Sequence, residues 1–360
     1  MRGAFNAGKA TSGYRANQEI MATGGSNATF DLSPKALVGV GVGLVAVGGA
    51  SYLLYRHLTR DVMPQKWRRV GTVQRIHFFP VKSCAPLEIA QPDVEYDVDV
   101  LSMSFEGIRD RTLMVVNDQN EMVTARVYPQ MTQIHSKKVS PGKLLFSAQD
   151  MPDLELDFEK LEGPEKDVRT AVWGVPVDVM PCGDRINKWF SQAILKKDSG
   201  LKLVHYPYPK PVMTINPRLK NMPFIRQEDS GTFNDATSYM LMNLSSVADL
   251  NTRLKNPVDA QQFRGNFELK MDVDEPYAED NWKWLRIGDD AVFRSVAPCT
   301  RCIFPNINVR TAERDPDGEP LKTLRSYRLF NYSSPALGIH LGLRLPGKVK
   351  ANDVVYVGYQ

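Results

Sequence analysis

The stretch Gly71-Thr72-Val73-Gln74-Arg75-Ile76-His77-Phe78-Phe79 alternates apolar and polar side chains and ends at Pro80. A period of two is typical of a half-buried β-strand, and proline is a common stop signal for one. Short strand-like runs recur along the chain, at 143–147, 167–173, 175–180, 202–205, 267–269, 291–296 and 354–358. Many short strands predict a β-rich α+β fold rather than a parallel α/β sheet.

Helical patterns are fewer than strand patterns. Residues Asp184–Lys196 place apolar side chains at helical spacing behind an aspartate, which predicts one helix. A second helix is expected over Ser245–Leu254, capped by its first or second serine. The runs 111–116 and 122–126 flank a polar turn and predict a β-hairpin.

A proline-rich loop is expected to divide the β-rich body. Four prolines fall within 207–217 and interrupt any regular element there. The part of the chain after the N-terminal segment has about 290 residues, which is enough for two closely packed domains. The sequence therefore predicts a β-barrel-like domain over 70–205 and a second domain over 206–360.

The N-terminal segment has three parts of different composition. Residues 1–33 are rich in small and polar residues without an apolar period, and we expect them to be disordered. Residues 34–56 contain the uncharged run Leu37–Tyr55, which as a helix would span about 28 Å, enough for a hydrocarbon core. Residues 57–69 are basic, and a positive flank favours the cytosolic side of a membrane. This pattern predicts a single transmembrane signal-anchor helix that contacts membrane lipid, with the C-terminal part in the cytosol.

Two other interpretations of the apolar run remain open. A cleaved signal peptide normally begins its apolar region much closer to residue 1, and no clear small-x-small cleavage site precedes the basic segment. A glycine-rich buried helix is the second alternative. We adopt the single-pass anchor as the prediction.

Composition excludes some classes of protein. The net charge is +4, which is too small to indicate a nucleic-acid partner. The four cysteines are scattered along the chain and form no disulfide framework, so we expect a reducing compartment.

We expect the chemistry of the chain in the stretch Ser295-Val296-Ala297-Pro298-Cys299-Thr300-Arg301-Cys302-Ile303. A thiolate is a strong ligand for soft metals, and a neighbouring guanidinium lowers the thiol pKa. Half of a zinc knuckle is disfavoured because the other cysteines stand alone and no histidine falls at zinc spacing. A thioredoxin-like pair should open a helix, whereas here a proline precedes the pair and an apolar, strand-prone run follows it. Two inert core cysteines are the third alternative.

Six motifs occur in a fixed order: P-V-K-S-C (80–84), G-I-R-D-R (107–111), F-N-D-A-T-S (233–238), F-R-G-N (263–266), A-P-C-T-R-C-I-F (297–304) and E-P-L-K-T-L-R-S-Y-R (319–328). This set resembles the MOSC family, which is named for the C-terminal domain of molybdenum cofactor sulfurase. With the predicted anchor it is most similar to the mitochondrial amidoxime-reducing branch of that family. The resemblance covers 70–360, and it implies a MOSC β-barrel domain preceded by a MOSC N-terminal β-rich domain.

The resemblance implies a bound Mo-molybdopterin, the molybdenum cofactor. A cofactor phosphate needs cationic groups, hydroxyls or backbone N–H groups. The motifs supply such groups at Lys82, Ser83, Arg111, Thr237, Arg264 and Asn266. The resemblance makes Cys302 the molybdenum ligand and a catalytic residue, with Thr300 and Arg301 lining the site and Cys299 structural or just behind it.

The motif at 233–238 leaves two roles to settle. Ala236 stands where the family has a hydroxyl, so only its backbone can bind the cofactor, and Thr237 must supply any side-chain bond. Asp235 is either the N-cap of a helix that follows the motif or a proton donor in the pocket, which makes it a catalytic candidate.

The implied activity is reduction of N-hydroxylated compounds (amidoximes, hydroxylamines and N-hydroxyguanidines) to amidines or amines. The resemblance also implies that electrons come from cytochrome b5 and the NADH-cytochrome b5 reductase. The chain shows no G-x-G-x-x-G motif opening a βαβ unit, so we expect that it does not bind NADH directly. The resemblance also implies a place in the mitochondrial outer membrane. Two alternatives remain: a non-catalytic carrier of sulfurated molybdenum cofactor, and a membrane-tethered β-scaffold without chemistry.

Overall fold

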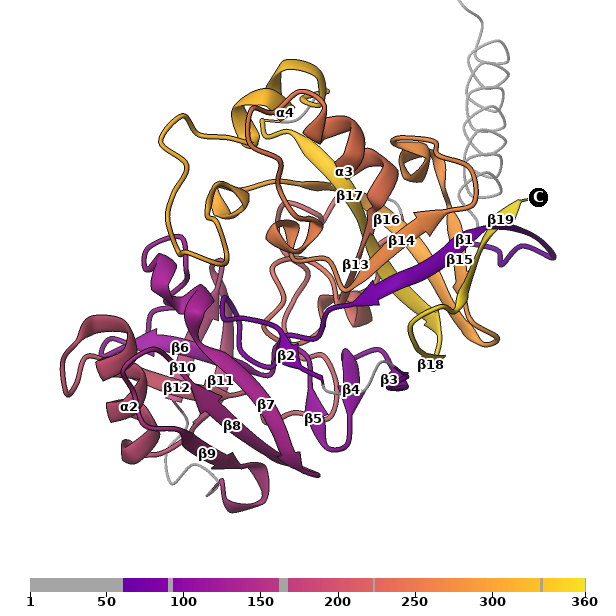
Figure 1. Ribbon diagram of the computed structural model, residues 1–360. Coiled ribbons are helices and arrows are strands. Elements are labelled where there is room, and N and C mark those ends of the chain that lie inside the picture. The colour runs from indigo at the N-terminus through magenta and orange to yellow at the C-terminus, as the bar shows by residue number, and fades with distance from the viewer. Residues whose placement is uncertain (1–60, 90–92, 162–167, 223, 331–332, 360) are drawn as a thin grey trace, which may run out of the picture. The chain divides into compact units, whose positions relative to one another are not determined.

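Residues 71–76 of the alternating stretch belong to β1 (Lys66–Ile76), one strand of a closed barrel, and the strand ends before the last three residues of that stretch (Figure 1). The computed structural model describes residues 61–89, 93–161, 168–222, 224–330 and 333–359, which belong to one compact unit. Around the barrel the order is β1, β14 (Phe267–Met271), β13 (Tyr239–Asn243), β17 (Ala336–Leu345), β16 (Ala291–Thr300), β15 (Trp284–Ile287) and β19 (Val354–Tyr359). Neighbouring strands are antiparallel except β13 and β14, which are parallel.

Three aromatic side chains fill the interior of this barrel. The ring centroids of Tyr239 and Phe293 are 5.2 Å apart, those of Phe267 and Phe293 are 5.6 Å apart, and all three side chains are fully buried. The alternation of the strands directs aliphatic residues such as Leu285 and Val355 toward the same interior. Aromatic pairs of this geometry add about 0.5–1.5 kcal/mol beyond burial of area, so the barrel has a specific packed core.

The strand β16 is irregular where it approaches the cysteine motif. Its register against β17 shifts between Ser295 and Ala297 and again between Pro298 and Thr300. Bulges of this kind redirect side chains at the ends of barrel strands. They bring the motif residues that follow to the end of the barrel.

The remaining strands form three small sheets beside the barrel. One contains β10 (Val168–Val172), β11 (Val175–Pro181), β12 (Leu201–His205) and β6 (Leu113–Asn117). The second contains β2 (Leu87–Glu88), β7 (His135–Ser140), β8 (Lys143–Ser147) and β9 (Leu154–Asp157). The third contains β18 (Gly347–Val349), β3 (Tyr96–Val98), β4 (Met103–Phe105) and β5 (Ile108–Arg109).

Three α-helices lie within the described residues. The amphipathic α2 (Asp184–Leu195) packs on β12 and β9 with its apolar face, which contains Trp189 and Phe190. The short α3 (Leu244–Asn251) packs on β14 and β13. Helix α4 (Leu321–Tyr327) lies within the last of the six sequence motifs, residues 319–328. Short 3-10 turns occupy 129–133, 158–160, 227–230, 260–263, 278–281 and 304–306.

The predicted β-rich class is confirmed by a closed barrel and three small sheets, whereas several local predictions are wrong. The helix over 245–254 begins one residue earlier, because the Asn243 side chain accepts the backbone N–H of Ser245 at 3.0 Å and caps it. The second hairpin strand at 122–126 is a turn, in which only Met122 makes an isolated bridge, to Val116. The segment Ile303-Phe304 continues into a 3-10 turn rather than a strand.

Strand β1 crosses the predicted division of the chain. Residues 66–69, assigned from sequence to a basic linker, pair with β19 at the far end of the chain. The predicted domains 70–205 and 206–360 thus share one barrel through β1, and the third small sheet likewise joins β3 to β18.

The predicted tail at 1–33, the signal-anchor at 34–56 and the first part of the basic linker lie outside the described residues. Within the residues that are described, no helix combines the length and the apolar character needed to cross a bilayer.

Candidate active site

All the predicted site residues line one cavity of about 170 Å³ at the end of the barrel. They are Lys82, Ser83, Arg111, Asp235, Ala236, Thr237, Arg264, Asn266, Thr300, Arg301 and Cys302. The walls come from loops before β6, before β13, before β14 and after β16, together with residues near β10 and on β17. Lys82 and His340 are distant in the chain but both line this cavity, because strands from both ends of the described chain close the same barrel.

The two motif cysteines have different surroundings. Cys299 is buried in β16 and packs in an apolar cluster with Met240, Met242 and Leu337. Cys302 follows the strand, is partly exposed and borders the cavity. Both thiols are free. Both residues contribute to the cavity lining, but Cys302 is the more exposed of the two, which favours it as the cysteine that a bound group would reach.

Arg301 supports the loop that carries Cys302. Its guanidinium donates hydrogen bonds to the carbonyl oxygens of Leu337 and Phe263 at 2.8 and 2.7 Å, and to the sulfur of Met242 at 3.1 Å. The side chain is buried, and no carboxylate pairs with it among the described residues. Because its donors are engaged by the protein, Arg301 holds the loop in place rather than offering a free fork to a ligand.

The expectation that Arg301 favours a Cys302 thiolate is not met in this structure. Burial raises the pKa of the Cys302 thiol, and the nearby Asp235 carboxylate raises it further. The Phe304 backbone and the Arg126 and Arg301 guanidiniums act in the opposite direction but do not outweigh burial. Burial also raises the pKa of Cys299. The desolvation cost of a thiolate here exceeds the attraction of its cationic neighbours.

The zinc and dithiol alternatives gain no support. Within the described ranges, no cluster of three or more His, Cys, Asp or Glu side chains could hold a metal ion. Cys302 precedes a 3-10 turn at Phe304–Asn306, not the helix that a thioredoxin-like pair opens.

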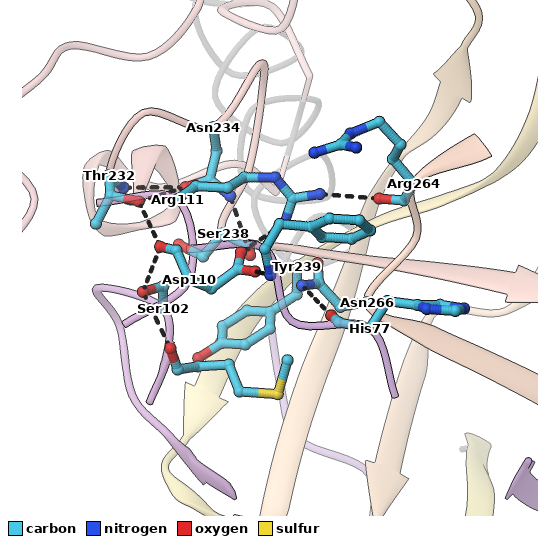
Figure 2. Close-up of polar contacts among 12 residues, drawn as sticks. His77, Ser102, Asp110, Arg111, Thr232, Asn234, Ser238, Tyr239, Arg264 and Asn266 are labelled. Atoms are coloured by element: carbon cyan, nitrogen blue, oxygen red, sulfur yellow. Dashed lines mark hydrogen bonds and ion pairs between the residues drawn. The ribbon is translucent and has the colours of Figure 1, made fainter. Parts of the chain in front are cut away.

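A buried carboxylate positions Arg111. The Asp110 side chain accepts the backbone N–H of Phe79 at 2.7 Å and a 2.5 Å bond from the Arg111 guanidinium. Arg111 also donates to the backbone carbonyl of Arg264 at 2.9 Å, as Figure 2 shows. The Asp110 carbonyl accepts the Thr232 hydroxyl at 3.0 Å. This fully buried network fixes the guanidinium at the cavity wall.

Arg264 carries a donor that the protein does not use. One guanidinium nitrogen donates to the Cys84 carbonyl at 2.8 Å, whereas the buried Nη2 has no hydrogen-bond partner among the described residues. Its guanidinium carbon lies 4.0 Å from the centre of the Phe79 ring, and that of Arg111 lies 4.7 Å from it. Burial and the neighbouring Arg111 lower the pKa of Arg264 to about 9. Two buried cations with one carboxylate between them leave a positive charge that an anion would neutralise.

Lys82 and Asp235, which both line the cavity, form an ion pair with each other. The Lys82 ammonium donates to the Phe233 carbonyl at 2.7 Å and to the Asp235 carboxylate, which also accepts Trp173 Nε1 at 2.8 Å. Burial lowers the pKa of Lys82, and Asp235 partly offsets this. Burial acts to raise the pKa of Asp235, but Lys82, Trp173 and Arg126 outweigh it and hold the pKa below its usual range.

The state of this ion pair decides between the two predicted roles of Asp235. The Asp235 side chain is 60% exposed to the open cavity, so solvent screens the pair and it adds little to stability. No helix follows the 233–238 motif, which leads instead into β13, so the helix-cap alternative is wrong. The lowered pKa makes Asp235 a carboxylate at neutral pH, and the proton of the pair resides on Lys82.

Hydrogen bonds to the protein already occupy two of the predicted hydroxyl and amide ligands. The Thr237 hydroxyl donates to the Tyr239 carbonyl at 2.8 Å and lies 3.2 Å from His340 Nδ1. The Asn266 side-chain amide donates to the His77 carbonyl at 3.3 Å. Ser83 has a φ of 71° within the Lys82 loop, and Thr300 is exposed at the rim.

Sequence reasoning missed several residues of the cavity wall. The Arg126 guanidinium lies over the Trp173 ring, 3.7 Å from its centre, and both residues line the cavity. His340 on β17 faces the cavity, and burial lowers its pKa to about 3, so it is neutral at physiological pH. Arg218 and Asn234 also line the wall. None of these belongs to a local motif with a chemical signature, apart from Asn234, which lies inside the 233–238 motif.

The cavity is strongly electropositive. Its lining contains the cations Lys82, Arg111, Arg126, Arg218, Arg264 and Arg301, and Asp235 is its one acidic residue among the described residues. Arginine forks with a buried unused donor suit a phosphate or carboxylate. A partly exposed thiol borders the same cavity. The arrangement can therefore hold a small anionic group and present a sulfur ligand to it.

Comparison with known proteins gives the family of this chain. Residues 70–197 match the MOSC N-terminal beta barrel domain, and residues 228–356 match the MOSC domain. Mitochondrial amidoxime-reducing component 1 of Mus musculus is 31% identical, covering 88% of this chain and 92% of that protein. The Homo sapiens component 1 is 31% identical with coverages of 88% and 93%, and the Homo sapiens component 2 is 29% identical with coverages of 88% and 92%. The chain thus belongs to the family of the mitochondrial amidoxime-reducing components, built from a MOSC N-terminal domain and a MOSC domain.

Proposed function

We propose that this chain is a molybdenum cofactor-dependent reductase that converts N-hydroxylated compounds to amidines or amines. The observation that carries the proposal is the buried, unpartnered Nη2 of Arg264 in an electropositive cavity that Cys302 also borders. Membership of the amidoxime-reducing family supports the class of substrate.

The residues present fit an anionic, metal-bearing cofactor. Arg264 and Arg111 would hold its phosphate, with Lys82 and the backbone of Ser83 and Ala236 adding further donors. Cys302 Sγ would be the metal ligand, and Cys299 stays in the apolar cluster behind it. When bound, the cofactor supplies a molybdenum centre that can exchange two electrons with an N–O bond.

The Lys82–Asp235 pair suits proton delivery. Reduction of an N–OH group to N–H with release of water consumes two electrons and two protons. Lys82 Nζ would hold a proton beside the open cavity, and burial lowers its pKa, which makes the ammonium a stronger acid than a free lysine. Asp235 keeps this ammonium in place and, through its bond to Trp173, orients the adjacent wall.

Family membership and the N-terminal sequence pattern support a proposal for the cellular setting. We infer a mitochondrial protein held in the outer membrane by one helix, with the described residues in the cytosol. Cytochrome b5 and its NADH-dependent reductase would supply single electrons from the same membrane surface.

Reconstitution of the full chain tests the proposed activity. Chain loaded with molybdenum cofactor, cytochrome b5, its reductase and NADH is expected to convert benzamidoxime to benzamidine, with metal content measured in parallel. A chain that retains molybdenum but reduces nothing, with either the protein donor or dithionite-reduced methyl viologen, would instead be a cofactor carrier. A chain that binds no molybdenum would be a scaffold.

Removal of residues 1–60 is expected to leave a folded, cofactor-loaded protein that no longer sediments with membranes. The described unit begins at Asp61, and its barrel is closed without the removed residues. Turnover with methyl viologen should persist, whereas turnover through membrane-bound cytochrome b5 should slow because co-tethering raises the effective concentration. Loss of molybdenum or of the fold would show that the apolar run is a core helix.

A further inference from the structure

The loop that carries Cys302 separates two hollows. Cys302 borders the electropositive cavity, whereas the next residue, Ile303, borders an open groove of about 560 Å³ on the surface. Asn306 and the helix α4 form the rest of this groove. One peptide unit therefore separates the proposed metal ligand from an open surface.

The groove has an apolar centre and a cationic edge. Ile303 is 48% exposed and supplies the apolar part of the groove lining together with the buried α4 residue Leu321. Lys322 and Arg325 of α4 are exposed, and neither has an ion-pair partner among the described residues, whereas Arg328 at the end of the same helix pairs with Asp280. Asp317 is the one acidic residue of the lining, so the groove carries a net positive charge.

The groove and Cys302 are parts of one rigid segment. Arg301 fixes the backbone before Cys302 through its bonds to Leu337 and Phe263. After Cys302, the chain turns in the 3-10 segment Phe304–Asn306, and the Asn306 side chain accepts the backbone N–H of Leu321 at 3.3 Å, which ties the turn to α4. A partner seated on the groove would keep a constant distance to Cys302.

We propose that this groove is the docking surface of the electron donor, a redox protein that presents carboxylates around an exposed redox group. This inference rests on the proposed reductase function and assigns its partner to a surface. Carboxylates of the donor would pair with Lys322 and Arg325, and an apolar edge would cover Ile303. Electron-transfer complexes have small interfaces and are transient, so two cations and one apolar contact are enough to orient such a partner.

The electron balance is simple. Each docking event oxidises one donor molecule by one electron, which passes through the Cys302–Ile303 segment to the site. Two such events supply the electron pair that breaks one N–O bond, and two protons complete the amine and the water.

The test uses the full chain, loaded with cofactor and reconstituted in vesicles with cytochrome b5 as the probe. The double variant Lys322→Glu/Arg325→Glu is expected to raise the apparent KM for cytochrome b5 by about tenfold or more and to lose the decline of rate with added salt. Molybdenum content and turnover with reduced methyl viologen should stay unchanged, because neither side chain reaches the cavity.

A matched control separates the effect of charge in the groove from the effect of the net charge of the protein. Lys196→Glu/Lys197→Glu makes the same change of net charge at two exposed lysines at the end of α2, which Figure 1 places far from α4. It should leave the KM for cytochrome b5 unchanged. An Ile303→Ser variant should weaken the donor interaction without altering its salt dependence.

Three results would overturn the docking surface. One is an unchanged KM in the Lys322/Arg325 variant, and another is an equal rise of KM in the α2 control. The third is that the Lys322/Arg325 variant binds cytochrome b5 with the same affinity as the parent chain in a direct binding measurement, which needs no turnover. The proposed reductase function would fail differently, by absence of amidoxime reduction with methyl viologen in the parent chain.

Discussion

Cys302→Ser is expected to lower amidoxime reduction by at least about 100-fold, since even residues behind a metal's ligands cost 10- to 100-fold in affinity or activity. Cys302 is the partly exposed cysteine of the motif and borders the cavity. Serine keeps the size of the side chain but is a much poorer ligand than a thiolate for a soft metal. The pterin should still bind, because the proposed phosphate contacts lie at Arg111 and Arg264. Turnover with methyl viologen, measured beside pterin content, checks this result.

Cys299→Ser is the matched control three residues earlier. Cys299 is buried in the apolar cluster with Met240 and Leu337, although it also contributes to the cavity lining. We expect some loss of stability and substantial residual activity, because the serine hydroxyl is buried among apolar groups. Equal activity of Cys302→Ser and the parent chain would remove Cys302 from the role of metal ligand.

Arg264→Ala is expected to weaken cofactor retention roughly 10- to 100-fold, because one charge-assisted hydrogen bond contributes about 1.5–3 kcal/mol and 1.4 kcal/mol is tenfold. The unused Nη2 donor is buried beside the cavity, and its removal leaves no carboxylate unpaired. The variant should purify folded but poor in molybdenum, with activity in proportion to metal content. Metal and pterin per chain, beside circular dichroism, measure this outcome.

Two further variants make the Arg264 result specific. Arg264→Lys should restore cofactor only in part, because an ammonium lacks the planar fork and its second donor. Arg169→Ala removes an exposed arginine that lies 3.8 Å from Asp178 and should change neither metal content nor stability measurably. Arg111→Ala should also lose cofactor, but with a larger cost in stability, since it leaves the buried Asp110 carboxylate without its cation. Full cofactor content in both Arg264→Ala and Arg111→Ala would show that these arginines do not hold the cofactor phosphate.

Local sequence patterns were sufficient to predict the class of fold and the residue types that line the site. Period-two stretches such as 71–79 and 143–147 fixed the β-rich class, because alternation is a local property that packing amplifies. All the site residues predicted from the ordered motifs line one cavity. The prediction was possible because each motif contains residues of a recognisable chemistry and the motifs occur in the order of the family.

The pKa shifts of the site residues and their hydrogen-bond partners could not be predicted from the sequence, because they depend on contacts between distant segments. The pKa of Cys302 depends on burial among segments distant in sequence, so the adjacent Arg301 was a misleading signal. Arg301 donates to the carbonyl oxygens of Leu337 and Phe263, and Asp235 pairs with Lys82, which lies 153 residues earlier in the chain. Strand β1 closes a barrel with β14 and β19, so the strand nearest the start of the described chain is held by some of its last residues. Such pairings depend on loop closure over hundreds of residues, and no local pattern encodes which distant partner a polar side chain will meet.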